Sequence, residues 1–133
     1  MFTKKRIIRQ IIIAVIILIP VGLYLAMTLD QNAKIKDLIF EPIDMTEVAD
    51  GTYQGEATTG MVTAQVEVTV VDHQIETIEL IRHDYGLGQK AETIIPLMVA
   101  QNTVEIDAIA GATTSSEVIK SAVCQALLQG IPE

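Results

Sequence analysis

Residues 62–70 read Val62-Thr63-Ala64-Gln65-Val66-Glu67-Val68-Thr69-Val70, and this stretch decides the fold class. Small apolar residues alternate with polar ones, the period of two that is typical of a strand with one buried face. Asp72-His73-Gln74 predicts a turn, and the apolar residues within 75–83 predict the returning strand. An earlier strand is expected over residues 52–58, so the pattern indicates an antiparallel meander of at least three strands.

Helical spacing follows the strands. Residues 90–101 are expected to form a helix that Pro96 kinks or restarts, and residues 104–109 a short apolar connection. A last helix is expected over residues 115–129, where apolar residues recur at i, i+3 and i+4 and Gly130 is a natural stop. Strands first and helices afterwards indicate an α+β domain, with helices packed on one face of an antiparallel sheet.

The N-terminal segment predicts a single transmembrane helix. Residues 1–10 carry four basic residues and no acidic one, and residues 11–29 carry no charge. As a helix this uncharged run is about 28 Å long at ~1.5 Å per residue, close to the ~30 Å hydrocarbon thickness of a bilayer. The basic flank is expected in the cytoplasm, which would place the C-terminal domain outside. A cleaved signal peptide is the alternative, but the apolar run is long for one and no clear cleavage site follows it.

The part of the chain after the span is strongly acidic. It holds all 17 acidic residues and five of the nine basic ones, a net charge of −12. Such a surface repels nucleic acid and anionic lipid, so neither is an expected partner. Residues 30–50 are expected to form a stalk, with a short helix near 32–39, and residues 51–133 a single domain. Cys124 is the only cysteine, which excludes an intramolecular disulfide and a CxxC site.

Residues 107–117 read Asp107-Ala-Ile-Ala-Gly-Ala-Thr-Thr-Ser-Ser-Glu117 and place four hydroxyl side chains at the expected start of the last helix. Thr114 and Glu117 fit a capping box, with Thr114 as the N-cap. A well-capped helix is therefore one interpretation of the segment. The other is a phosphate site, because the first turn of a helix offers unpaired N–H groups and the positive end of its dipole. The two small residues before Thr113 leave room for an anion beside its hydroxyl.

The segment resembles the flavinylation motif of the FMN-binding domain family, which is an Asp, two variable residues, Ser or Thr, and then Gly-Ala-Thr. Asp107, Gly111, Ala112 and Thr113 match this motif, whereas Ala110 stands where the family usually has a hydroxyl residue. The likeness extends over residues 51–129. It includes the opening Asp50-Gly-Thr-Tyr-Gln-Gly-Glu56, the valine-rich strand, the Gly86-Leu87-Gly88 loop and the terminal helix.

The resemblance implies FMN joined as a phosphoester to the Thr113 hydroxyl by a separate flavin transferase that uses FAD as donor. Asp107 would orient the segment, and the loop at residues 86–88 would line the flavin ring. Tyr85 could stack on that ring or could equally be a half-buried loop residue. The cofactor-binding residues implied in this way are Tyr85, Gly86, Leu87, Gly88, Asp107, Gly111, Ala112, Thr113, Thr114 and Ser115.

The function expected from this likeness is electron transfer outside the membrane, from a membrane redox partner to an external acceptor. The chemistry would belong to the flavin, so no catalytic residue is expected. A covalent link suits this location, because a dissociated cofactor would be diluted away. One alternative is a peripheral subunit similar to those that carry flavin in the Rnf and sodium-pumping NADH:quinone oxidoreductase complexes. Another is a non-redox module that binds FMN reversibly or serves only for interaction.

The remaining polar residues give weaker signals. His73 and His83 have no partner at ligand spacing, so no metal site is expected. Ser115 and Ser116 lack the context of a hydrolase nucleophile. Lys90 could face a phosphate or a ribityl hydroxyl, or could simply be solvated at a helix start. Cys124 is expected to be a small residue at the core or its rim.

Overall fold

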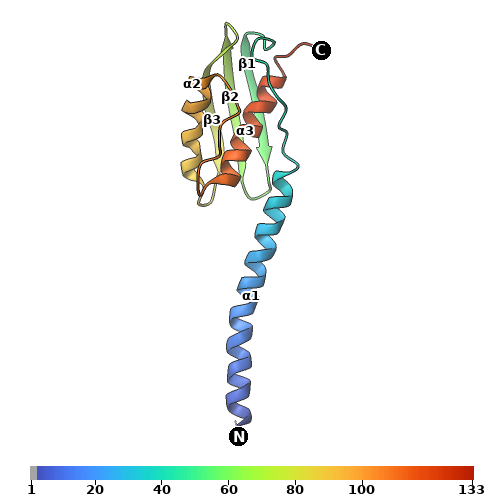
Figure 1. Cartoon of the computed structure of the whole chain (residues 1–133), viewed down its shortest axis with the longest axis vertical. Coiled ribbons are helices and arrows are strands. Elements are labelled where there is room, and N and C mark those ends of the chain that lie inside the picture. The colour runs from blue at the N-terminus through green and yellow to red at the C-terminus, as the bar shows by residue number, and fades with distance from the viewer. Residues whose placement is uncertain (1–2) are drawn as a thin grey trace. The chain divides into compact units, whose positions relative to one another are not determined.

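A computed structural model describes residues 3–133 of the chain. The chain divides into two compact units, Met1–Ala33 and Lys34–Glu133. The elements, in chain order, are α1 (Lys4–Ile35), β1 (Gly51–Thr58), β2 (Thr63–Val71), β3 (Gln74–Asp84), the 3-10 helix η1 (Gln89–Thr93), α2 (Ile94–Gln101) and α3 (Thr113–Leu128). In the second unit all the described strands precede the helices, and the fold is α+β as expected (Figure 1).

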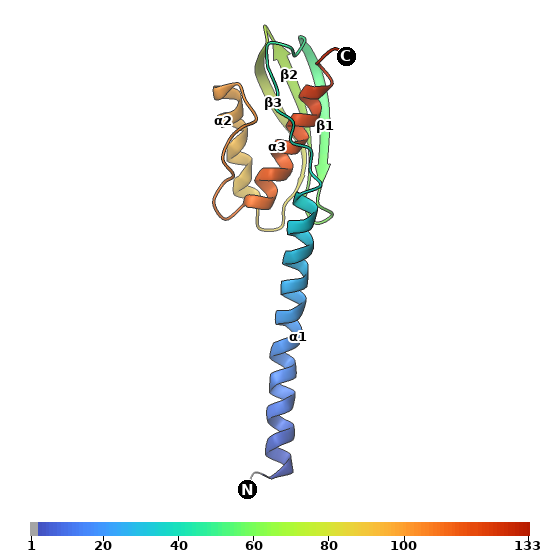
Figure 2. The ribbon, with the colours of Figure 1, turned by 45° about the vertical axis from the view of Figure 1, so that its right-hand side comes forward.

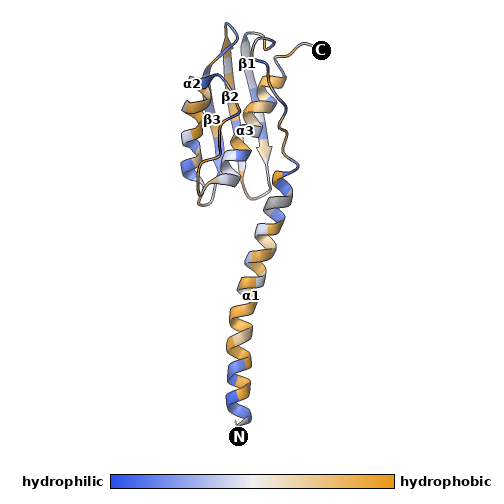
Figure 3. Cartoon of the chain, in the orientation of Figure 1, coloured by the Kyte–Doolittle hydropathy of each residue, from blue (hydrophilic) through white to orange (hydrophobic). Residues whose placement is uncertain are grey.

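From Lys4 to its end at Ala33, the first unit belongs to the long helix α1. Its residues 4–30 form one helix that is long and apolar enough to cross a membrane. Its apolar side chains are exposed, and Figure 3 shows the hydrophobic colour along its middle and the hydrophilic colour at its N-terminal end. Pro20 lies inside the helix without ending it. The helix continues beyond the expected span as far as Ile35, so the short helix expected near residues 32–39 is in part the end of α1.

The sheet has the order β1-β2-β3, and both neighbouring pairs are antiparallel. The alternating valines of β2 point into the core: Ala64, Val66, Val68 and Val70 are all buried. The turn between β2 and β3 consists of Asp72 and His73, whose φ angles are 51° and 59°. Two consecutive left-handed residues give the tight turn whose twist matches that of the flanking strands. The meander predicted from residues 52–83 is therefore confirmed.

Both α-helices of the domain pack on one face of the sheet (Figures 1 and 2). α3 contacts β1 and β2, and α2 contacts β3. α3 approaches β1 at Gly55, where a side chain would lie only 2.8 Å from the backbone nitrogen of Ala126. This close approach buries the apolar side of α3 against the valines of β2, and it requires glycine at position 55.

The helix expected over residues 90–101 is divided into two elements. η1 ends at Thr93 and α2 begins at Ile94, which places Pro96 in the first turn of α2. A proline is tolerated there because the N–H groups of the first turn have no acceptor inside the helix. α2 ends at Gln101. The next residue, Asn102, has a φ of 52°, and its side-chain oxygen accepts a hydrogen bond of 2.8 Å from the Ile75 amide in β3.

Residues 36–50, which are expected from the sequence to form a stalk, lie against α3. The Ile39 amide donates to the Ser121 hydroxyl at 3.1 Å, and the Glu41 amide lies 3.4 Å from the Cys124 sulfur. Further along, Met45 and Val48 are buried in the core. The segment thus covers the side of α3 that faces away from the sheet, which explains why both Ser121 and Cys124 are buried.

Candidate functional site

The small residues before α3 form a tight turn. The Ala112 amide donates to the Ile109 carbonyl at 2.9 Å, and Gly111 has a φ of +77°. A positive φ at the third position is required in a type II turn, and glycine meets this requirement without strain. The chain then enters α3 directly, with Ala112 as N-cap and Thr113 as the first helical residue.

The capping box expected at Thr114 and Glu117 is not formed. α3 begins one residue before Thr114, no side chain caps it, and Glu117 pairs with Lys120 at 3.4 Å. Ser116 takes the structural role instead: its hydroxyl donates to the Ala112 carbonyl at 2.8 Å and accepts from the Ile109 amide at 3.0 Å. Since the turn leads straight into the helix, Thr114 lies within the first turn and cannot act as its N-cap. Nothing in the spacing of the hydroxyl residues distinguishes Ser116 beforehand.

A second loop, between β3 and η1, reaches the same place. The Gly88 amide donates to the Tyr85 carbonyl at 2.7 Å, and Gly86 has a φ of +53°. Gly88 lies against Ser115 of α3, and a side chain on Gly88 would be 2.8 Å from the Ser115 Cβ. Leu87, at the tip of this loop, is 99% exposed. The loop is thus tied at Gly88 to the helix start and presents an apolar side chain to solvent.

The two loops enclose a shallow cavity of about 190 Å³. Eight of the ten residues predicted to bind the cofactor line it, and Gly86 lies in the same loop without lining it. Val62, the residue just before β2, also lines the cavity and is not among the predicted residues. The lining residues are Val62, Tyr85, Leu87, Gly88, Gly111, Ala112, Thr113, Thr114 and Ser115.

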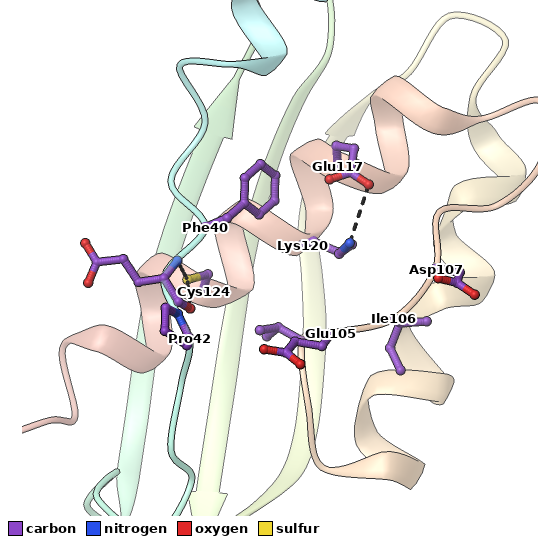
Figure 4. Close-up of a pocket in the computed structure, with 10 residues that line it drawn as sticks. Phe40, Pro42, Glu105, Ile106, Asp107, Glu117, Lys120 and Cys124 are labelled. Atoms are coloured by element: carbon purple, nitrogen blue, oxygen red, sulfur yellow. Dashed lines mark hydrogen bonds and ion pairs between the residues drawn. The ribbon is translucent and has the colours of Figure 1, made fainter.

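Asp107 is the one predicted residue that lies elsewhere. It lines two larger cavities of about 450 and 440 Å³ and not the cavity that contains Thr113. Figure 4 shows the first of these, where Asp107 and Glu105 lie on the connection before α3 and Lys120 and Cys124 lie on α3 itself. Asp107 therefore does not line the cavity that contains Thr113.

His83 is a site neighbour that its position at a predicted strand end did not reveal. Its side chain is 2% exposed, and its Nδ1 lies 2.9 Å from the Glu92 carboxylate in η1. Its ring lies beside that of Tyr85, with the centroids 4.9 Å apart. The His83 Nε2 is buried and has no hydrogen-bond partner within residues 3–133. The His83–Glu92 pair joins β3 to η1, and the His83 ring packs against that of Tyr85. Among the described residues no cluster of three or more potential metal ligands is found.

The four hydroxyl residues at the start of α3 differ in exposure. Thr113 is exposed and Thr114 half-buried, whereas Ser115 and Ser116 are buried. A model of the FMN-binding domain family matches residues 22–128, from within α1 to the end of α3. The chain belongs to the FMN-binding domain family. A search of curated proteins gave no match.

The cavity at Thr113 fits the phosphate end of FMN. Gly111 and Ala112 carry little or no side chain, and the first-turn N–H groups of α3 have no acceptor within the helix. Those groups and the helix dipole favour an anion at this position. Tyr85, Leu87 and Val62 supply apolar surface beside it. The family match begins before residue 50, which agrees with the packing of residues 36–50 on the FMN-binding domain.

Proposed function

We propose that this protein is a membrane-anchored electron-transfer protein whose domain lies outside the cytoplasm and carries FMN joined to Thr113 by a phosphoester bond. The observation that carries the proposal is the position of Thr113. Its hydroxyl is exposed at the first turn of a helix, within a cavity formed by the two glycine-containing loops.

Exposure favours Thr113 over its neighbours as the attachment point. A transferase must reach the hydroxyl that it modifies, and Ser115 and Ser116 are buried. The Ser116 hydroxyl is also engaged in two hydrogen bonds. Thr114 is half-buried, so Thr113 is the most accessible of the four.

The bond itself is a simple exchange on phosphorus. The Thr113 oxygen would replace AMP on the phosphorus of the FMN half of FAD, and the hydroxyl proton would leave. The product is a phosphodiester with a single negative charge. This anion would sit at the N-terminus of α3, where the helix dipole and the free N–H groups stabilise it.

The size of the cavity gives a physical reason for a covalent link. At about 190 Å³ it is smaller than the ~300–1,000 Å³ of sites that enclose a small ligand. FMN held there would leave much of its surface in water, and burial alone would bind it weakly. Outside the cytoplasm, free cofactor is dilute, and mass action would empty a weak site. A phosphoester bond to Thr113 would prevent the cofactor from dissociating.

The topology of the proposal rests on α1. Four of its five basic residues precede the apolar stretch, Lys34 lies in its last turn, and the more basic flank stays in the cytoplasm. The FMN-binding domain would then face the opposite side, attached to a helix that keeps it near a membrane redox partner. Bound flavin supplies the one- or two-electron chemistry, while Gly88, Gly111 and the start of α3 hold and orient it.

A denaturing gel tests this proposal. The full chain is produced in cells that contain the flavin transferase, and the membranes are dissolved in hot denaturant. We expect flavin fluorescence at the protein band for the unaltered chain and for Thr113→Ser, and none for Thr113→Ala. Thr77→Ala, at an exposed threonine of β3, is the matched control and should keep the label. A dark band from the unaltered chain would contradict covalent attachment, and flavin released by the denaturant would favour reversible FMN binding.

A further inference from the structure

Lys90 lies across the backbone of Gly111, next to the first residue of α3. An ideal Cβ on Gly111 would be 2.6 Å from the Lys90 Nζ and 3.2 Å from its Cε. The ammonium group therefore occupies the space that a side chain at position 111 would need. Gly111 lines the cavity that contains Thr113, so this cation lies beside one of the lining residues of that cavity.

The charge of Lys90 is not satisfied by a carboxylate. Arg82 pairs with Asp84, and Lys120 pairs with Glu117 and lies over the Phe40 ring. Lys90 forms no ion pair with an acidic residue in the described part of the chain, residues 3–133. In a region with a net charge of −12, an ammonium without a carboxylate partner is notable. Its neighbour is instead a backbone turn that could hold an anion.

The backbone that carries Lys90 is held from several sides. The Thr93 hydroxyl donates to the Lys90 carbonyl at 2.8 Å, and the Ala91 amide donates to the Gly88 carbonyl at 3.0 Å. Ala91 is fully buried, and Glu92 pairs with His83 in β3. η1 is thus attached both to the sheet and to the loop at residues 85–88. The side chain of Lys90 therefore extends toward Gly111 from a backbone that these contacts hold in place.

We propose that Lys90 is the counter-ion of the phosphodiester at Thr113 and positions the phosphorus for its transfer from FAD. This inference rests on the proposed function. Its ligand class is a phosphodiester monoanion, which one ammonium group neutralises. The N–H groups of α3 approach the phosphate from the helix side, and the Lys90 ammonium approaches it over Gly111. Because hydrogen bonds to charged groups are the stronger ones, the loss of Lys90 affects both the transfer and the bound phosphate.

The first measurement is the rate of labelling. The full chain, purified without flavin, is incubated with transferase and FAD, and the fluorescence of the denatured band is followed over time. We expect Lys90→Gln to slow labelling about tenfold or more and Lys90→Arg to stay within about threefold of the unaltered chain. Lys36→Gln is the matched control, since Lys36 is also exposed, and its rate should not change.

The second measurement separates phosphate binding from recognition by the transferase. Each variant is labelled to completion, and the ³¹P chemical shift of the full-length holoprotein is recorded. We expect a changed shift in Lys90→Gln and an unaltered one in Lys36→Gln, with Lys90→Arg close to the unaltered chain. Thr113 labelled at the normal rate in Lys90→Gln, with an unchanged ³¹P shift, overturns the role of Lys90 alone. An unaltered chain that takes no label overturns the proposed function, and the role of Lys90 with it.

Discussion

Gly88 lies directly against the side chain of Ser115, and this contact joins the loop after β3 to the start of α3. A methyl group on Gly88 would be 2.8 Å from the Ser115 Cβ and 3.2 Å from the Tyr85 carbonyl oxygen. Ser115 is buried and cannot turn away into solvent. Gly88→Ala should therefore push the loop from the helix, at a cost of about 1–3 kcal/mol in the free energy of unfolding.

The same variant should also lose flavin attachment, because the displaced loop opens the cavity at Thr113. Thermal unfolding of the full chain in detergent measures the stability, and fluorescence of the denatured band measures the label. Leu87→Ala provides a comparison in the same loop, since Leu87 is almost fully exposed and its removal leaves the contact intact. Equal stability and labelling of Gly88→Ala and the unaltered chain would contradict the contact.

Gly55 gives a prediction for the fold that is independent of the flavin. Its Cα faces the backbone of α3 at Ala122 and Ala126, and backbone atoms cannot move aside as a side-chain end can. Gly55→Ala should lower the free energy of unfolding by about 3 kcal/mol. The thermal unfolding midpoint of the flavin-free chain is the measurement, and a midpoint within a degree or so of the unaltered protein would count against this packing.

Cys124 gives a prediction that depends on pH. Burial raises the pKa of the Cys124 thiol above its ordinary value of 9.0, while a backbone hydrogen bond from Glu41 opposes the rise. Since the folded pKa is the higher one, the thiol favours the folded state below about pH 9, and this contribution is lost as pH rises through the raised pKa. The thiolate absorbance of the folded chain, taken as the difference from Cys124→Ser, should therefore have its pH midpoint above 9.0, and in urea near it. Identical profiles in the two conditions would refute this.

The orientation of the domain can be tested by cysteine labelling, because the native Cys124 is buried. Glu133→Cys places a thiol at the exposed C-terminal residue, and Thr3→Cys places one before α1. In intact cells a maleimide that does not cross membranes should label the first and not the second. Labelling of position 3 alone would reverse the proposed topology.

The sheet could be predicted from the sequence because apolar and polar residues alternate along residues 62–70 and the turn at Asp72 and His73 is short. This alternation follows from the geometry of a single strand, so it can be recognised without knowing which other residues the strand contacts. Residues 36–50 gave no such signal. Their place depends on contacts with Ser121 and Cys124, more than eighty residues away, which no local pattern encodes.

In the candidate site, too, local sequence motifs could be predicted, whereas contacts between distant residues could not. The Gly-Ala-Thr segment and the Gly86-Leu87-Gly88 loop could be predicted from the sequence, and all of these residues except Gly86 line one cavity. The predicted start of α3 is wrong because a turn closed by Ala112 and Ile109, with both residues hydrogen-bonded to Ser116, replaces the capping box. The sequence left two interpretations of Lys90 open and did not place His83 at the site, since their positions depend on the way η1 packs against β3 and Gly111.

The intact mass of the full-length protein tests the central claim most directly. Protein is purified from cells with and without the flavin transferase, and each sample is measured under denaturing conditions. The proposal predicts a single increment of FMN less one water, found only with the transferase and located on Thr113 by fragmentation. An unmodified mass from cells that contain an active transferase, or an increment located on another residue, would contradict it.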